Sequence, residues 1–325
     1  MSPEESIEQA LNDLNLPEEP ARLYDPIRHT LRTGGKRMRP KFVLLGCELC
    51  GGDPNKAIPA ALSVELIHNF TLIHDDIMDD AATRRGQPTV YNQWGTNDAI
   101  LSGDYLFALA FDQIGRYKDE ENIDKYQFGR LYETLLSGVR TVCEGQSRDM
   151  AFESAESITL EDYLQMIGQK TAALLQTSVE LGAIVGGGDP ASIKKAGQIA
   201  YDAGIAFQIQ DDMLDAVGDA EKFGKKIGGD VREQKKTCLY VMALEKESEQ
   251  GQQKLRQWYA SSGGVSEEDV KHIIDKFRST GALDASEQLM SSYYQQAVER
   301  LEEFDRKNAV EKIKTLLEQL RVREK

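Results

Sequence analysis

Two stretches of this 325-residue chain, 136 positions apart, repeat one pattern. Each opens with Gly-Gly-Asp-Pro, at residues 51–54 and 187–190, and each reaches Asp-Asp-x-x-Asp 22 residues after its first aspartate. An Asp-Pro pair after glycines is typical of a helix start, because the aspartate accepts from free N–H groups and proline needs none. The repeat therefore predicts two equivalent helices, each running about 33 Å from its start to its acidic cluster.

The rest of the chain has the same helical character. Ala, Leu, Glu, Gln and Lys fill its segments, and runs of alternating β-branched residues are scarce. Ser266 before Asp269 resembles a helix cap. No low-complexity linker divides the chain. We therefore predict one all-α domain over residues 1–325. Its amphipathic final helix would bury Ile313, Leu316, Leu317 and Leu320.

The composition excludes several classes of protein. The formal net charge is −15, whereas a general nucleic-acid binder needs a basic surface. The acidic first residues disfavour a signal peptide, and no apolar run is long enough for a membrane span. Cys47 and Cys50 form a lone C-x-x-C, too few ligands for structural zinc. We expect a cytoplasmic protein with reduced, mostly buried cysteines.

The acidic clusters predict metal sites. Residues three and four apart share a helix face, so each cluster brings its carboxylates together. A solvated surface is the usual place for such charges, but core-like segments at residues 70–73 and 207–209 precede them. Mg²⁺ prefers oxygen ligands and usually binds one or two carboxylates together with substrate phosphates. The predicted ligands are Asp75, Asp76, Asp79, Asp211, Asp212 and Asp215.

The helix face below each cluster can be followed back in steps of four, seven and eleven residues. On the first helix it includes His68, and on the second it includes Gly204 and Ala200. Gln208, four residues before Asp212, shares the second acidic face. The small residues predict room for a ligand body beneath the metals. A long apolar ligand with a phosphate head would fit this arrangement.

Basic segments accompany both acidic clusters. Residues 34–40 put three cations beside two glycines, which allow close backbone approach, and arginine can contact phosphate through two hydrogen bonds. Each segment alone is weak evidence, since basic loops are common. Basic loops after both clusters are what metals and anionic phosphates together require. The other segments are residues 83–86, 224–230 and 235–237, and the pair Lys170 and Thr171.

The order of these motifs between about residues 25 and 240 resembles the trans-isoprenyl diphosphate synthases, closest to the short-chain archaeal geranylgeranyl and farnesyl type. The resemblance implies an all-α fold around a deep central cavity and a homodimer. It implies Mg²⁺, three ions in each active site. The implied reaction joins isopentenyl diphosphate to an allylic diphosphate and gives a short all-trans prenyl diphosphate.

The resemblance also assigns roles to single residues. It implies catalytic roles for Lys170, Thr171 and Gln208, and it leaves the choice between Lys225 and Lys226 open. The implied isopentenyl diphosphate site consists of Lys36, Arg39, His68 and Arg85. The implied allylic diphosphate site consists of Arg84, Lys170, Thr171, Gln208, Lys225 and Lys235.

Product length depends on the residues before the first cluster. In the family, a bulky residue five positions before the first aspartate limits the chain, and here that residue is Phe70. An ideal helix would instead direct Thr71 along the acidic face. The uninterrupted spacing from Asp76 to Asp79 resembles the archaeal geranylgeranyl type. We therefore predict a C20 product, with a C15 farnesyl product as the alternative.

Three other functions remain possible on the sequence alone. A class I terpene cyclase would share metal-assisted ionisation, but Lys36, Arg39 and the second Asp-Asp-x-x-Asp argue against it. A metal phosphohydrolase would use His74 and Asp75 but leaves the second cluster unexplained. A non-catalytic subunit of a heteromeric synthase should have lost site residues, and none is missing.

Overall fold

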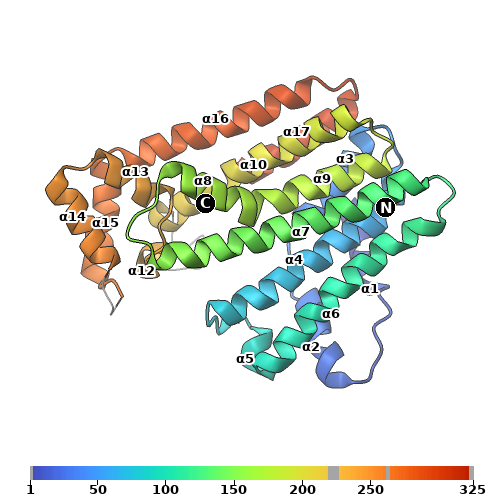
Figure 1. The fold of residues 1–325 in the computed structure, drawn as a ribbon, viewed down its shortest axis with the longest axis horizontal. Helices are drawn as coiled ribbons and strands as arrows, with labels where there is room; N and C mark the ends of the chain where they lie inside the picture. Colours follow the sequence, from blue (N-terminus) through green and yellow to red (C-terminus); the bar gives the residue numbers. More distant parts are fainter. Residues whose placement is uncertain (1–2, 219–226, 261–263, 322–325) are drawn as a thin grey trace. The chain divides into compact units, whose positions relative to one another are not determined.

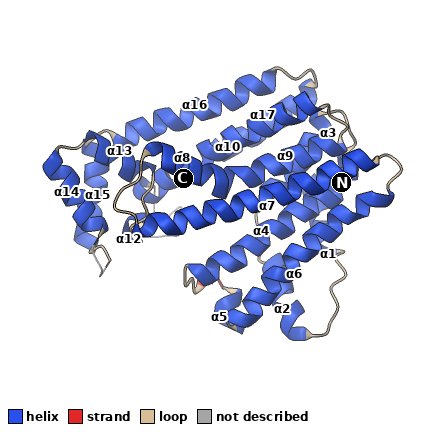
Figure 2. Ribbon diagram, viewed as in Figure 1, coloured by secondary structure: helices blue, strands red, loops and turns tan. Residues whose placement is uncertain are grey.

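The computed structural model describes residues 3–218, 227–260 and 264–321. Within these ranges the regular structure is helical apart from one two-stranded hairpin (Figure 2), which confirms the all-α prediction. The chain forms two compact units: Met1–Val139 with Thr177–Gly197, and Arg140–Gln176 with Gln198–Lys325. No helix in the described ranges is long and apolar enough to cross a membrane.

The first unit contains the first acidic helix. α4 packs along α6 (Figure 1) and also against α3. The elements that lie wholly in this unit are α1 (Pro3–Asn12), α2 (Ala21–Arg32), α3 (Met38–Leu49), η1 (Pro54–Ala57), α4 (Ile58–Met78), β1 (Thr83–Arg84), β2 (Gln87–Pro88), α5 (Val90–Trp94), α6 (Thr96–Gly115) and η2 (Arg116–Asp119).

The second unit holds most of the C-terminal half. Its core gathers around α13, whose residues from Cys238 to Leu244 are all buried. The elements that lie wholly in this unit are α8 (Leu160–Ile167), η3 (Gly168–Ala172), α12 (Gly229–Arg232), α13 (Cys238–Lys246), α14 (Glu249–Tyr259), α15 (Glu267–Ser279), α16 (Ala282–Glu302) and α17 (Lys307–Arg321). Three helices contribute residues to both units: α7 (Lys125–Ser154), α9 (Ala173–Val185) and α10 (Pro190–Val217).

Both repeated helices begin at their predicted caps. Asp189 accepts from the N–H groups of Ala191 and Ser192, and α10 starts at Pro190. Asp53 accepts from Asn55 N–H, but the first turn there is the 3₁₀ helix η1, which continues into α4. The repeat thus predicted both helices, and only the tighter first turn of one differs.

Two C-terminal predictions are also confirmed. Ser266 Oγ accepts from Asp269 N–H at 3.1 Å and caps α15. α17 is amphipathic and buries the four apolar residues named for it: Ile313, Leu316, Leu317 and Leu320.

Candidate functional site

The first acidic cluster lies at the C-terminal end of α4. Asp75 and Asp76 are in its last turn, and Asp79 is the C-cap residue. Asp76 is 5% exposed and its Oδ1 accepts a hydrogen bond from Arg84 Nε at 2.7 Å, whereas Asp79 is exposed. Burial raises the pKa of Asp76, against the lowering effect of the Arg84 guanidinium. The structure therefore distinguishes Asp76, tied to a cation, from the more accessible Asp79.

Arg84 and Arg85 belong to a short hairpin that the sequence did not predict. β1 pairs antiparallel with β2, with Arg84 opposite Gln87. Arg85 and Gly86 have φ angles of 52° and 75°, the left-handed conformation that a type I′ turn requires at both central residues. The Arg85 guanidinium donates to the carbonyl oxygen of Gly34. The hairpin thus brings the basic segment 83–86 onto the basic segment 34–40.

The segment 34–40 divides its cations between two environments. Arg37 is 6% exposed, and its guanidinium donates to Glu65 Oε1 at 2.6 Å, Glu8 Oε1 at 2.8 Å and Leu31 O at 2.9 Å. All three bonds join the guanidinium to other residues of the protein, so Arg37 is a structural residue. Lys36 is exposed.

Arg39 instead contacts His68, another residue predicted for the isopentenyl diphosphate site. Arg39 Nη1 lies 3.0 Å from His68 Nε2. Arg39 Nε is buried and has no hydrogen-bond partner among the described residues. Burial lowers the pKa of Arg39 to about 10. Burial, followed by the charges of Arg39, Arg85 and Arg84, lowers the pKa of His68 well below its usual value. The arrangement is a neutral histidine among cations, suited to an anionic ligand.

The second acidic cluster lies in the last two turns of α10, and its central aspartate is fully engaged. Asp212 is 5% exposed and accepts from Tyr163 OH at 2.6 Å, Gln208 Nε2 at 3.0 Å and Cys238 N–H at 3.4 Å. Burial raises the pKa of Asp212 to about 6. Asp211 and Asp215 are both partly buried.

The Gly-Gly-Asp segment at residues 228–230 folds against this cluster. The N–H of Gly228 donates to Asp215 O at 2.7 Å, and the N–H of Asp230 donates to Asp215 Oδ2 at 2.9 Å. A Cβ at Gly229 would lie 2.9 Å from Asp215 Oδ1, so glycine permits this approach. Burial, with the charges of Asp212 and Asp215, raises the pKa of Asp230 to about 8. The motif thus adds a further carboxylate beside the cluster.

Lys170 and Thr171 lie on η3, a turn of π-helix between α8 and α9. Such turns often occur at functional sites, where the wider coil displaces side chains. Lys170 donates to the Asp149 carboxylate, and Thr171 Oγ1 donates to Gln208 Oε1 at 2.9 Å. Gly145 of α7 permits this packing, because a Cβ there would lie 2.2 Å from Lys170 N. The three residues predicted to be catalytic therefore have defined partners within the second unit.

The remaining predicted lysines differ in their surroundings. Lys235 is partly exposed and lies 2.7 Å from Glu233 Oε2. Its neighbour Lys236 is 8% exposed and donates to the carbonyl oxygens of Phe152 and Glu153 at the end of α7. Lys225 and Lys226 lie outside the described residues.

The residues predicted to control product length differ in their contacts. Thr71 Oγ1 donates to His68 O within α4. Phe70 packs edge-on against His74 and against Phe107 of α6, with ring centroids 4.8 Å and 5.5 Å apart. The row of rings continues through Phe111 to Tyr132. Phe70 is thus the first ring of an aromatic row that joins α4, α6 and α7.

The prediction that small residues of the second helix leave room for a ligand body is wrong at Gly204. A Cβ at Gly204 would lie 2.7 Å from Ala172 Cα and 3.3 Å from Leu175 Cδ1. Ala200 is fully buried. Glycine there serves the close packing of α10 on η3 and α9.

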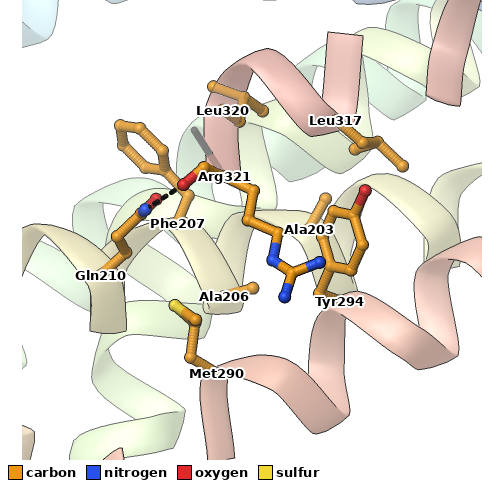
Figure 3. Close-up of a pocket in the computed structure, with 9 residues that line it drawn as sticks. All are labelled: Ala203, Ala206, Phe207, Gln210, Met290, Tyr294, Leu317, Leu320 and Arg321. Carbon is orange, nitrogen blue, oxygen red and sulfur yellow. Dashed lines mark hydrogen bonds between the residues drawn. The ribbon is translucent and has the colours of Figure 1, made fainter. Parts of the chain in front are cut away.

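Each unit contains a small cleft. In the second unit, α10, α16 and α17 form a groove lined mainly by apolar side chains, where Gln210 Nε2 donates to Arg321 O (Figure 3). Its cavity volume is about 20 Å³, which is room for about one water molecule. In the first unit, a cleft of about 30 Å³ includes Asp76, Arg84 and Arg85. A cavity of about 540 Å³ beside η1 and η2 contains none of the predicted site residues.

The donor set fits Mg²⁺ in the way that this ion binds phosphates. Among the described residues, no three His, Cys, Asp or Glu side chains form a ready cluster for a metal. Mg²⁺ does not need one, because it usually takes one or two carboxylates, with waters and phosphate oxygens as the other ligands. In the first unit Asp75 and Asp79 provide such carboxylates, and in the second unit Asp211 provides one.

The comparisons with known proteins all indicate the same family. Residues 20–277 match the family model described as polyprenyl synthetase. A short chain isoprenyl diphosphate synthase of Methanothermobacter thermautotrophicus is 39% identical over 95% of this chain and 91% of its own. A geranylfarnesyl diphosphate synthase of Aeropyrum pernix is 37% identical over 86% of each chain. The crystal structure of geranylgeranyl pyrophosphate synthetase from Pyrococcus horikoshii Ot3 superposes with a TM-score of 0.91, at 37% identity, covering 99% of this chain and 96% of that one.

Proposed function

Because this chain belongs to the polyprenyl synthetase family, we propose that it is a Mg²⁺-dependent trans-prenyltransferase. It joins isopentenyl diphosphate to allylic diphosphates and makes mainly geranylgeranyl diphosphate. The whole chain forms one catalytic domain, in the cytoplasm. All four of its cysteines are free thiols, as a reducing compartment would keep them.

The observation that carries this proposal is the group of cations beside the first acidic cluster. Arg39 lies on His68, Arg85 reaches the segment that carries Arg39, and Arg84 is bonded to Asp76. Anionic ligands and metal ions are both needed to offset such a mixture of charges. A diphosphate bound with Mg²⁺ supplies both.

The mechanism begins with binding. Lys36, Arg39, His68 and Arg85 hold isopentenyl diphosphate. Arg84, Lys170, Lys225 and Lys235 hold the allylic diphosphate. Asp75, Asp79 and Asp211 would be the main ligands of three Mg²⁺ ions, with Asp76, Asp212 and Asp215 beside them. Bound Mg²⁺ would neutralise the allylic diphosphate and weaken its bond to carbon.

The protein then stabilises the positive charge that forms on the allylic substrate. The C–O bond of the allylic substrate breaks, and the diphosphate leaves with the electron pair. Gln208 Oε1 and Thr171 Oγ1, which are hydrogen-bonded at 2.9 Å, stabilise the allylic cation electrostatically. The double bond of isopentenyl diphosphate, held in place by the cations, forms the new C–C bond. A proton is lost to the departing diphosphate, and apolar walls keep water from the cation.

Product length would be limited by Phe70. In Phe70→Ala the loss of the first ring of the aromatic row is expected to shift the main product from C20 to C25 or longer. Liquid chromatography with mass spectrometry of the dephosphorylated prenols measures the shift. Phe111→Ala, which removes a ring that does not touch Phe70, is the matched control and should keep C20. Longer products from Thr71→Ala, with none from Phe70→Ala, would assign chain length to the acidic face instead.

The enzyme would act as a homodimer. Large apolar side chains are exposed on α6 and on the part of α7 that lies in the first unit: Ile100, Leu101, Tyr132 and Leu136. Phe111 on Tyr132 joins the two helices into one face. Sedimentation equilibrium should give twice the 36.3 kDa of one chain, and Leu101→Glu with Leu136→Glu should give the monomer mass. A monomeric wild-type protein would contradict the dimer.

One assay tests the proposed function as a whole. The protein is incubated with Mg²⁺, labelled isopentenyl diphosphate and dimethylallyl, geranyl or farnesyl diphosphate in turn. The proposal predicts geranylgeranyl diphosphate as the main product with every starter. A C15 product would replace C20 by the farnesyl alternative, and no elongation with any starter would reject the function.

A further inference from the structure

Tyr163 is a buried tyrosine that belongs to none of the motifs described above. It lies on α8, where Thr159 and Asp162 form a capping box that fixes the start of the helix. Tyr163 is 1% exposed, and its hydroxyl donates to Asp212 Oδ2 at 2.6 Å. A tyrosine hydroxyl is protonated at neutral pH, so it is the donor in this bond.

The bond from Tyr163 holds the Asp212 carboxylate in place, and Asp212 in turn orients the side-chain amide of Gln208. Gln208 Nε2 donates to Asp212 Oδ1 at 3.0 Å, so the NH₂ group of the Gln208 amide faces the carboxylate. The carbonyl oxygen of the same amide then faces Thr171, whose hydroxyl donates to it at 2.9 Å. Tyr163 and Gln208 thus both donate to Asp212, and Thr171 donates to Gln208. The four side chains form one connected set of hydrogen bonds that converges on Asp212.

The orientation of the Gln208 amide determines which atoms of Gln208 and Thr171 can face a positive centre. The Thr171 hydroxyl has given its only hydrogen to Gln208, so Thr171 Oγ1 has only lone pairs left to offer. Gln208 Oε1 likewise keeps a second lone pair. A reversed amide would place an NH₂ group, which carries positive charge on its hydrogens, where an acceptor is needed.

We propose that Tyr163 is a positioning residue for catalysis, because its bond to Asp212 fixes the Gln208 amide with the carbonyl oxygen available to the allylic cation. This inference rests on the proposed function. Without the hydroxyl, the one remaining donor to Asp212 Oδ2 among the described residues would be the Cys238 N–H at 3.4 Å. A poorly satisfied buried carboxylate can rotate, and its hold on the amide weakens.

The first test removes only the oxygen. In Tyr163→Phe, kcat for condensation is expected to fall roughly 10- to 100-fold, as is typical when the partner of an active-site ligand is lost. KM for isopentenyl diphosphate should not change. Tyr240→Phe is the matched control, because Tyr240 is fully buried in the same core and its hydroxyl has no partner among the described residues. Its kcat should stay at the wild-type value.

A double-mutant cycle separates positioning from folding. In a Gln208→Leu background there is no amide to orient, so adding Tyr163→Phe should lower kcat little further. If Tyr163 only stabilises the fold, its substitution should lower kcat by the same factor in both backgrounds. Equal factors would overturn the proposal.

A readout without turnover tests the orientation itself. The side-chain NH₂ signals of Gln208, labelled with ¹⁵N and assigned by their loss in Gln208→Leu, should exchange slowly in the wild type. They should exchange faster in Tyr163→Phe, and unchanged exchange would overturn the proposal. If exchange accelerates but the wild type makes no prenyl product, the orientation stands and the proposed function fails.

Discussion

Asp75→Asn and Asp211→Asn are each expected to lower the rate of condensation by at least about 10³-fold. Asparagine keeps the size of the side chain and removes its charge. Each aspartate would hold Mg²⁺ on the allylic diphosphate, where metal ions contribute several kcal/mol to stabilising the developing charge. The measurement is the steady-state rate at saturating substrates, followed by a Mg²⁺ titration. Excess Mg²⁺ should restore part of the lost rate, because the weakened site still binds at higher concentration.

Asp80→Asn is the matched control for this prediction. Asp80 lies one residue beyond the first cluster and is exposed, and its carboxylate accepts from the Tyr91 hydroxyl. Its φ of 50° is a conformation that asparagine adopts readily. The variant should turn over like the wild type. Full activity of Asp75→Asn and Asp211→Asn would remove both clusters from the mechanism.

Arg39→Met is expected to raise KM for isopentenyl diphosphate by roughly 10²-fold, with KM for the allylic substrate unchanged. Methionine keeps part of the side-chain volume without the charge. Arg39 Nε is buried with no partner among the described residues, which leaves it available to a diphosphate oxygen. Initial rates with each substrate varied in turn measure the two KM values.

Arg37→Met, two residues away, provides the contrast. Arg37 forms a buried ion pair with Glu65 at 2.6 Å, and both side chains are 5% exposed. Breaking such a pair typically lowers the free energy of unfolding by about 3–5 kcal/mol. Arg37→Met should therefore reduce stability in urea without raising KM in the folded enzyme. If Arg37→Met raises KM and Arg39→Met does not, the two residues have been assigned the wrong way round.

The long helices could be predicted from the sequence because their signals are local. Asp189 caps the first turn of α10 through N–H groups only two and three residues away. The acidic motifs were also readable, since spacings of three and four residues hold wherever the helix lies. The family resemblance is confirmed by the match over residues 20–277.

Side-chain direction could not be predicted, because it depends on distant partners. Arg37 and Arg39 are two residues apart in the sequence, yet Arg37 is hydrogen-bonded to Glu65 and Arg39 to His68. Gly204 is ambiguous in the same way, since a glycine serves a ligand cavity or close helix packing equally well. The structure resolves this in favour of packing on Ala172.

The π-helical turn and Tyr163 also lay beyond sequence reasoning. Nothing between Gly168 and Ala172 departs from an ordinary helical pattern, and the close approach of that turn to Gly145 of α7 is a long-range contact. From the sequence alone Tyr163 would be predicted to be an ordinary core aromatic residue, because its partner Asp212 is 49 residues away in the chain. Long-range hydrogen bonds of this kind leave no periodic signal.

Release of inorganic diphosphate, measured with and without isopentenyl diphosphate, distinguishes prenyl transfer from simple loss of the diphosphate. With Mg²⁺ and farnesyl diphosphate alone, we expect almost no release. On adding isopentenyl diphosphate, one diphosphate should be released for each geranylgeranyl diphosphate formed. Rapid release without isopentenyl diphosphate would indicate a cyclase or a phosphohydrolase and would contradict the proposed prenyl transfer.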